Sequence, residues 1–307
     1  MIDFVSTAPT TGTLDVSWRH GSPPHSHRHE PPIQVHWYDE HTAILRQSKD
    51  VTFEAPFLFL LFGNDRALLL DSGATKDDTV RVMVDDLVET WLTKHPRPRY
   101  RLVVAHTHGH GDHIGGDGAF YGRRDTDVVG HGVEDVRVFF GFTSWPEQIV
   151  TYDLGGRVLT LSGIPGHHAA SIAVHDPWTG LLFTGDSVMP GRLYVSDMRQ
   201  YLDSVERLVA FADGRTVIAV LGCHVEMSGV PGKDYFPGCR YQPNEKPLQL
   251  PVAILRDVHA AVRQAAATPG VYVQDDFIIY NGMGWMATAR LNVRQLLGST
   301  RTAFSRG

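Results

Sequence analysis

The sequence lacks the features that mark disulfide-bonded, secreted and membrane-spanning proteins. It contains only two cysteines, Cys223 and Cys239, which form no CxxC pair; this excludes a disulfide framework and favours a reducing compartment. The N-terminus has neither the basic nor the apolar region of a secretory signal. The longest apolar run, around Phe57 to Phe62, has only the length of a strand. We therefore expect a soluble, cytoplasmic protein with no membrane partner.

An excess of positive charge is also missing. The chain has 28 lysines and arginines against 34 aspartates and glutamates, and its formal net charge is −6. Because these charges are mixed and form no basic stripe, we expect no nucleic-acid partner. There is no GxSxG motif, so serine acyl-enzyme chemistry is not expected. A small-molecule substrate fits these absences, and the composition leaves a homo-oligomer open.

Two parts of the chain differ in pattern. Residues 1–32 are rich in Pro, Ser, Thr and Gly, which predicts an irregular N-terminal segment. Residues 33–307 mix short apolar runs with helical periodicity, which predicts a single α/β domain with layered sheets. The first runs predict an antiparallel meander, with FLFLLF as a central strand because it is apolar on both faces. Helices are expected at 77–94, 132–139, 198–211 and 252–267, and a long loop is expected at about 225–250.

Histidine is unusually frequent, with 17 copies, and three of them cluster after one apolar strand. The motif THGHGDHIGG, residues 107–116, brings these histidines and an aspartate together within six residues. The first two histidines are two residues apart, so they project the same way from extended backbone. Imidazole and carboxylate together suit zinc, and they suit iron or manganese as well. The candidate ligands here are His108, His110, Asp112 and His113.

Further polar residues stand at the ends of other apolar strands. IPGHHAAS contains His167 and His168, LLFTGDS contains Asp186, and AVLGCHVE contains His224. A lone histidine or aspartate at a strand end is more often structural than functional. Combined with residues 107–116, however, these residues form a set large enough for two metal ions. Cys223 is expected to be an inert, partly buried thiol rather than a ligand.

Five motifs, taken in chain order, resemble those of the metallo-β-lactamase-fold hydrolase superfamily: LLLDSG, THGHGDHIGG, IPGHHAASIAV, LLFTGD and LGCH. The resemblance implies an αββα four-layer sandwich with the metals at one edge, between the sheets. It implies a first metal held by His108, His110 and His167. It implies a second metal held by Asp112, His113 and His224, with Asp186 bridging the two.

The resemblance also assigns supporting residues. Asp71, in LLLDSG, would orient the ligand loop. The family pattern His-Thr-Pro-Gly-Ser after the third histidine ligand is replaced here by His-His-Ala-Ala-Ser. We assign the ligand to His167 because it follows Pro165 and Gly166, and we keep His168 as an alternative ligand or as a residue that contacts the ligands.

This ligand set predicts a metal-dependent hydrolase. Two divalent ions, zinc above iron or manganese, can share a water and lower its pKa to near 7. The expected nucleophile is therefore a metal-bridged hydroxide, with Asp112 as the catalytic residue that orients it and handles a proton. The expected substrate is an ester, thioester or lactone. Because true β-lactamases of the fold generally lack the bridging aspartate, Asp186 favours the branch with glyoxalase II-like enzymes and lactonases.

Three alternatives remain open at this point. A mononuclear iron dioxygenase of the same fold would use similar ligands, a β-lactam hydrolase would share the fold, and a scaffold protein would have no activity. Substrate contacts are assigned to Trp145 in the aromatic stretch FFGFTSWP, to Tyr194, and to Tyr235 in the long loop. A local hydrophobic cluster explains Trp145 equally well.

Overall fold

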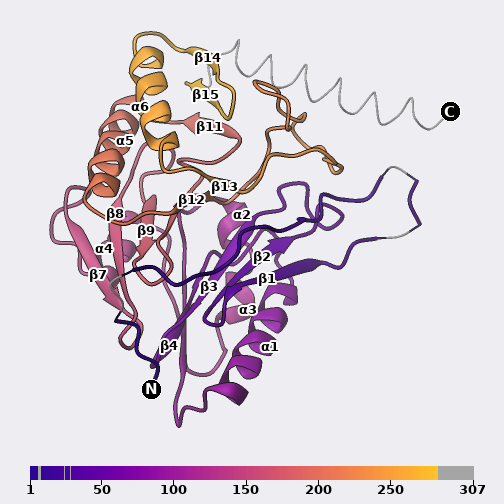
Figure 1. The fold of residues 1–307 in the computed structure, drawn as a ribbon, viewed down its shortest axis with the longest axis vertical. Coiled ribbons are helices and arrows are strands. Elements are labelled where there is room, and N and C mark those ends of the chain that lie inside the picture. The colour runs from indigo at the N-terminus through magenta and orange to yellow at the C-terminus, as the bar shows by residue number, and fades with distance from the viewer. Residues whose placement is uncertain (6–7, 24, 28, 283–307) are drawn as a thin grey trace.

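The computed structural model describes residues 1–5, 8–23, 25–27 and 29–282 (Figure 1). Its first sheet has six strands whose spatial order follows the chain. These strands are β1 (Ile33–Asp39), β2 (Thr42–Gln47), β3 (Phe57–Phe62), β4 (Arg66–Leu70), β5 (Arg101–Ala105) and β6 (Thr126–Val128). β1 to β4 pair antiparallel, as the sequence predicts for this meander, and β4, β5 and β6 pair in parallel. Every residue of β3 is buried, which agrees with its doubly apolar pattern.

The second sheet also has six strands, in the order β13-β12-β10-β9-β8-β7. Their bounds are β7 (Ile149–Asp153), β8 (Val158–Gly163), β9 (Ile172–Asp176), β10 (Leu181–Gly185), β12 (Ala219–Gly222) and β13 (Gln249–Leu250). Neighbouring strands are antiparallel except β10 and β12, which run in parallel. β10 and β12 therefore end at the same edge of the sheet.

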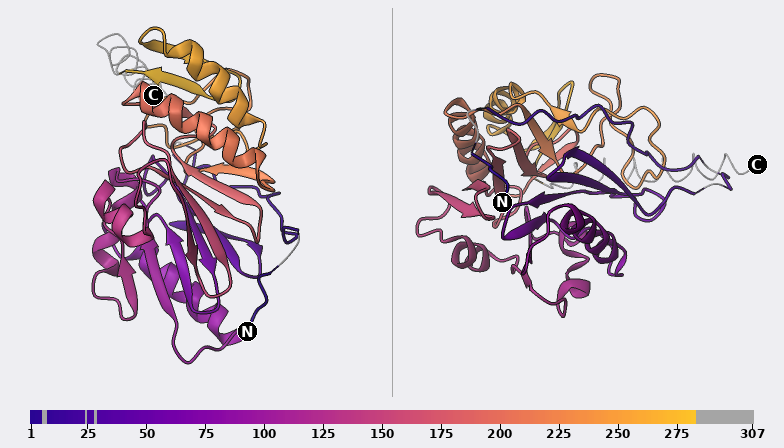
Figure 2. Two further views of the ribbon diagram at one scale, coloured as in Figure 1. Left: turned by 90° about the vertical axis from the view of Figure 1, so that its left-hand side faces the viewer. Right: turned by 60° about the horizontal axis from the view of Figure 1, so that its bottom comes forward.

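The described residues form the helices α1 (Thr79–Lys94), α2 (Gly111–Ile114), α3 (Asp117–Phe120), α4 (Val133–Phe140), α5 (Met198–Asp213) and α6 (Ile254–Ala265). The three longest cover the outer faces of the two large sheets, α1 on the first sheet and α5 and α6 on the second (Figure 2). One apolar cluster lies between the sheets and joins Phe59 and Leu68 to Leu161 and Phe183. A second cluster joins the first sheet to α1, and a third joins the second sheet to α5 and α6. The chain thus has the αββα sandwich that the resemblance implies.

A third, small sheet was not predicted. It pairs β11 (Arg192–Val195) in parallel with β15 (Ile278–Asn281), which pairs antiparallel with β14 (Gly270–Val273). β11 escapes sequence reasoning because it opens on Arg192, a charged residue that is buried here. Its guanidinium lies in ion pairs with Glu226 and Asp234, both from the long loop. A buried charge with such distant partners breaks the apolar pattern by which strands are found.

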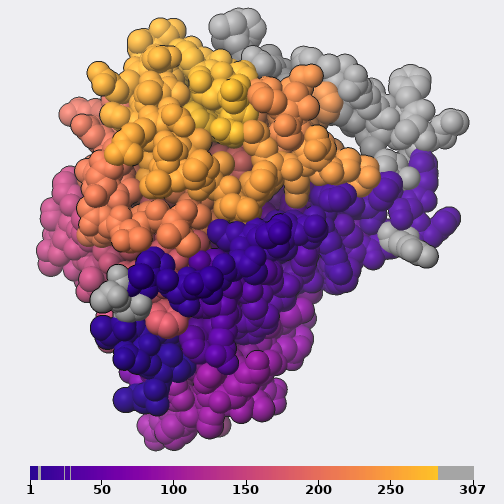
Figure 3. Space-filling model, viewed as in Figure 1, coloured from indigo at the N-terminus to yellow at the C-terminus, as the bar shows by residue number. Residues whose placement is uncertain are grey.

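The described part of residues 1–32 forms neither a helix nor a strand. It runs across the surface between the two halves of the fold, as the indigo atoms in Figure 3 show. Its backbone N–H groups at Thr10 and Thr13 donate to the carbonyls of Trp178 and Tyr38, at 2.7 and 3.1 Å. None of the helices among the described residues combines the length and the apolar character that a bilayer crossing requires. The division into residues 1–32 and one domain over 33–307 stays a prediction, because residues 283–307 lie outside the described part.

Candidate metal centre

Four strands of the two large sheets carry polar residues just beyond their final residues. β5 leads into the loop with His108 and His110 and then into α2. β8 leads to His167, β10 ends directly before Asp186, and β12 is followed by Cys223 and His224. The folding of the two sheets against each other therefore brings together residues up to 116 positions apart, as between His108 and His224.

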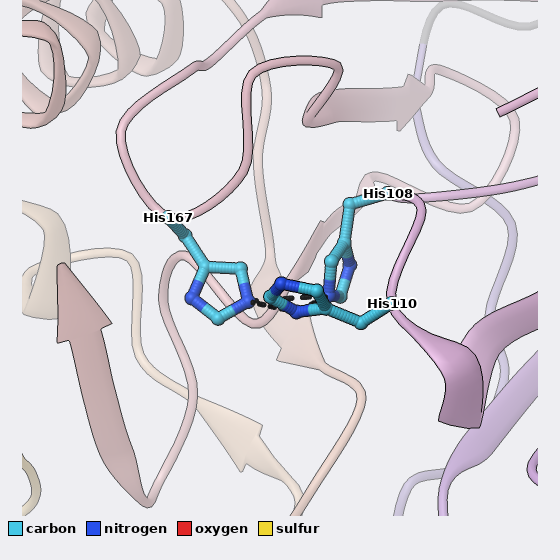
Figure 4. A group of neighbouring side chains, drawn as sticks. All are labelled: His108, His110 and His167. Atoms are coloured by element: carbon cyan, nitrogen blue, oxygen red, sulfur yellow. Dashed lines mark hydrogen bonds between the residues drawn. The ribbon is translucent and has the colours of Figure 1, made fainter. Parts of the chain in front are cut away.

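Three imidazoles converge in a first group (Figure 4). Nε2 of His108 lies 2.9 Å from Nδ1 of His110, and Nε2 of His167 lies 3.1 and 3.0 Å from these two atoms. Three nitrogens bound to one tetrahedral zinc at about 2.0–2.1 Å would lie ~3.3 Å apart. The spacing of these three atoms is close to that value, so the group fits one metal ion.

A second group contains Asp112, His113 and His224. Oδ2 of Asp112 lies 3.2 Å from Nε2 of His224 and 3.5 Å from Nε2 of His113. The two Nε2 atoms lie 3.3 Å apart. His113 and His224 are buried, whereas the side chain of Asp112 retains 23% of its exposure. Asp112 is thus the ligand candidate of this group that an approaching molecule can reach.

Asp186 lies between the two groups. Its Oδ2 is 3.9 Å from Nε2 of both His108 and His167, and 3.5 Å from Nε2 of His113. Its Oδ1 is 3.6 Å from Nε2 of His224. This Oδ1 atom is buried and accepts no hydrogen bond from any described residue. A buried carboxylate oxygen without a donor is costly, and a cation on each side would satisfy the group.

In four of these histidines, the ring nitrogen that points away from the centre lies within hydrogen-bonding distance of another group. Nδ1 of His167 lies 2.7 Å from the carbonyl oxygen of Tyr194, and Nδ1 of His224 lies 2.9 Å from that of Glu54. A carbonyl only accepts, so both Nδ1 atoms carry hydrogen, and in the neutral form of each ring the Nε2 atom would offer its lone pair to a metal at the centre. Metal-binding histidines are commonly held in this way. Nδ1 of His113 lies 2.8 Å from Asp71 Oδ2, and Nδ1 of His108 lies 3.2 Å from Thr107 Oγ1.

The two groups differ in electrostatics. Burial and the nearby imidazoles of His167 and His168 lower the pKa of His110 to about 4. In the second group, carboxylates outweigh burial: Asp186 and Asp112 raise the pKa of His224 to about 9. In the first group His108, whose pKa burial lowers well below its ordinary value, and His110 are therefore neutral at neutral pH, while the second group favours positive charge, which a divalent cation would supply.

Asp71 contacts Thr107, at the start of the loop that carries the first ligands, and Cys223, which directly precedes the candidate ligand His224. Its Oδ1 accepts from the backbone N–H of Thr107 at 2.7 Å, and its Oδ2 accepts from the Thr107 hydroxyl at 2.8 Å. The Cys223 thiol also donates to Oδ2, at 3.2 Å. Burial and the Asp71 charge raise the pKa of Cys223 well above its ordinary value, so this fully buried thiol stays protonated. This agrees with the expected inert cysteine, which is more deeply buried than the sequence suggested.

Residues 51–220 match the metallo-beta-lactamase superfamily, and this match covers more than half of the chain. The chain belongs to the metallo-beta-lactamase superfamily. The resemblance stated from the motifs is therefore confirmed.

Curated relatives within this superfamily carry hydrolase names. An acyl-coenzyme A thioesterase MBLAC2 of Gallus gallus is 28% identical over 212 residues, which cover 56% of this chain and 73% of that protein. A hydroxyacylglutathione hydrolase of Thermosynechococcus vestitus is 34% identical over 116 residues, covering 34% of this chain and 43% of that enzyme. The chain thus spans less than half the length of the second relative. Both names agree with the predicted hydrolase of the glyoxalase II-like branch.

Solved structures of the superfamily share the fold. The metallo-beta-lactamase FIM-1 of Pseudomonas aeruginosa, in its mono-zinc form, superposes with a TM-score of 0.52 at 13% identity. That superposition covers 78% of this chain and 98% of FIM-1. The metallo-beta-lactamase of Pontibacter korlensis gives a TM-score of 0.50 at 16% identity and covers 75% and 99% of the two chains. At such low identity these similarities concern the fold alone.

The other residues predicted for the site have different surroundings in the structure. They are His168, Tyr194, Tyr235 and Trp145. The His168 ring lies beside the first group, with its centroid 5.1 Å from that of His110, and its Nδ1 accepts from the N–H of Ala170. Tyr194 lines a cavity beside the centre, but its hydroxyl already accepts from Arg192. The Tyr235 hydroxyl accepts from Asn244, and Trp145 packs against Phe142 in the core between the sheets. The substrate contacts of Trp145, Tyr194 and Tyr235 stay predictions.

The sequence analysis did not identify the groups that hydrogen-bond to the histidine ring nitrogens facing away from the centre. Glu54 and Tyr194 act through their backbone carbonyls, which no side-chain pattern reveals. Thr107 could have been noticed, because a hydroxyl residue between the strand and the first ligand is well placed to bond to its neighbours. Its hydroxyl joins Asp71 to His108.

Proposed function

We propose that this chain is a dinuclear metal-dependent hydrolase that cleaves a thioester of a small molecule. The observation that carries the proposal is the position of Asp186 between two groups of three ligand atoms. Two groups of ligands that share one carboxylate fit two metal ions better than they fit a single ion. The names of the relatives support thioesters, since both an acyl-coenzyme A and a hydroxyacylglutathione are thioesters.

His108, His110 and His167 would hold one ion, and Asp112, His113 and His224 would hold the other, with Asp186 shared. Zinc is proposed for both, because a set of imidazole and carboxylate ligands suits it. When bound, such ions act as Lewis acids that activate water and polarise a carbonyl oxygen. The mixed ligand set of the second group argues against a mononuclear iron enzyme, which would leave Asp112, His113 and His224 without a role.

The protein residues contribute orientation and proton transfer. The carbonyls of Tyr194 and Glu54 and the carboxylate of Asp71 fix which nitrogen of each ring faces the centre. Hydrogen bonding to His224 and the charge of His113 outweigh burial and hold the pKa of Asp112 below its ordinary value, so its carboxylate is ionised at neutral pH. As the most accessible of the carboxylates at the centre, Asp112 would orient the attacking water and accept its proton at Oδ.

The test is a substrate panel on protein loaded separately with zinc, manganese or iron. We expect hydrolysis of thioesters above esters, lactones and β-lactams, with two metal ions per chain at full activity. Asp112→Asn should keep the shape of the side chain and lose most of the turnover. Oxygen uptake with one iron per chain, or no hydrolysis of any member with any metal, would contradict the proposal. The cytoplasmic location and the oligomeric state stay predictions.

A further inference from the structure

A cavity of about 170 Å³ lies directly beside the candidate metal centre. It is lined by Glu54 and Tyr194, whose carbonyl oxygens lie within hydrogen-bonding distance of Nδ1 of His224 and His167. None of the seven candidate ligands lines the cavity, but Glu54 and Tyr194 place it next to one histidine of each ligand group. Its volume is below the roughly 300–1,000 Å³ of pockets that enclose a whole drug-sized molecule. It has room for one end of a substrate rather than for all of it.

Lys49 is the unusual residue in the wall of this cavity. The residue is only 2% exposed, and its Nζ donates one hydrogen bond, to the carbonyl of Phe53 at 3.1 Å. An ammonium group has three N–H donors, and no carboxylate of the described residues lies within ion-pair distance of this one. Buried lysines are rarely left without a partner of opposite charge, because removing an ammonium from water is costly.

The other charged groups of the cavity do not provide this partner. The guanidinium of Arg192 is paired with Glu226 and Asp234, so Glu226 is already engaged. Glu54 also lines the cavity, but among the described residues its carboxylate forms no ion pair with Lys49. Gln242 also lines the cavity, is 4% exposed, and leaves its Oε1 without a hydrogen-bond partner. Two buried polar side chains with unused hydrogen-bonding capacity thus share one small space.

We propose that this cavity binds a carboxylate group of the substrate, with the Lys49 ammonium as its charge partner. Gln242 supplies a polar neighbour that accepts an N–H or O–H next to the carboxylate. A monoanion fits better than a phosphate dianion, because Glu54 and Glu226 also line the cavity and would repel a second negative charge. Phe53 and Phe236 supply apolar wall for the carbon chain that bears the carboxylate. This inference rests on the proposed function, since it names the class of thioester that the same centre would favour.

The first experiment compares thioesters that differ only by one carboxylate. One pair carries the charge on the acyl part, as glutaryl against pentanoyl thioesters of the same thiol. The other pair carries it on the thiol part, as pentanoyl thioesters of 3-mercaptopropionate against propanethiol. We expect kcat/KM to favour the charged member of one pair by roughly tenfold to a hundredfold, the value of a hydrogen bond to a charged group. The pair that shows the preference identifies which part of the substrate enters the cavity.

Lys49→Met removes the charge and keeps an unbranched chain of similar length. In this variant we expect the two members of each pair to be hydrolysed equally well, through a higher KM for the charged member. Lys94→Met, at an exposed lysine in the last turn of α1, is the matched control and should retain the preference. An absence of preference in the wild-type protein, or an equal loss on both members in Lys49→Met, would overturn the inference while leaving the hydrolase proposal intact.

A binding measurement separates this inference from the proposed activity. Protein stripped of metal is heated with millimolar pentanoate or with its neutral analogue pentanamide. We expect pentanoate alone to raise the melting temperature of the wild-type protein, and neither compound to raise that of Lys49→Met. Such a result would support the carboxylate site even if no thioester were hydrolysed. Equal shifts with both compounds, or an unchanged pentanoate shift in Lys49→Met, would overturn it.

Discussion

Oδ2 of Asp71 lies 2.8 Å from Nδ1 of His113, and both side chains are fully buried. Despite the opposing effect of burial, Asp186 and Asp71 raise the pKa of His113 well above its ordinary value. Asp71 thereby fixes which nitrogen of the ring faces Asp186 and Asp112. The same carboxylate holds Thr107, so one buried aspartate positions both the start and the end of the ligand loop.

Asp71→Asn tests this positioning role. Asp71 has a positive φ of 69°, which asparagine tolerates well, so the backbone should be preserved. We expect the affinity for the second metal ion to fall by about 10- to 100-fold, with a parallel loss of activity, because the amide cannot replace the charge behind His113. Zinc titration against a competing chelator measures the affinity. Asp127→Asn, at a surface ion pair with Arg101, is the control, and equal affinities in the two variants would contradict the role of Asp71.

Removal of a single ligand should separate metal binding from folding. His110→Ala and Asp112→Ala are each expected to lower kcat/KM by more than about a hundredfold, a larger effect than that of a residue behind the ligands. His110 and Asp112 are partly accessible and lie outside the cores between the layers, so the far-ultraviolet circular dichroism should be unchanged. Normal turnover in either variant would show that the side chain is not part of the centre.

Gly166 should be needed to place His167. It has a φ of +134°, and a Cβ there would lie 2.4 Å from the Cα of Tyr201, in α5. We expect Gly166→Ala to lower the free energy of unfolding by about 2 kcal/mol or more, through backbone strain and this clash. Denaturant unfolding measures the loss. Gly118→Ala meets no atom within 4 Å and is the control, so similar losses in both variants would refute the explanation.

Several parts of this architecture could be predicted because they depend on local pattern. β3 is apolar on both faces, and the ligand loop directly follows the buried strand β5, so both are visible in the sequence. β11 could not be found, because its buried Arg192 depends on Glu226 and Asp234, which are more than thirty residues away. The support of His167 and His224 could not be found either, because it comes from the main chain at Tyr194 and Glu54.

Lys49 should make the stability of the protein depend on pH in alkaline solution. Burial, with the positive charge of Arg46, lowers the pKa of Lys49 to about 8 in the folded state, against about 10.4 in an unfolded chain. Between these values the unfolded state binds more protons, so the free energy of unfolding rises with pH. Between pH 7 and pH 11 we expect the free energy of unfolding of the wild-type protein to rise by about 3 kcal/mol relative to that of Lys49→Met. Urea unfolding at several pH values gives this difference, and a constant difference would contradict the lowered pKa.

The central claim is that seven side chains from separate loops hold two divalent cations. Anomalous diffraction at the zinc edge, from crystals of the zinc-loaded protein, measures the positions of these ions directly. We expect two peaks, one bounded by His108, His110 and His167 and the other by Asp112, His113 and His224, with Asp186 reaching both. A single peak, or peaks away from these residues, would contradict the account.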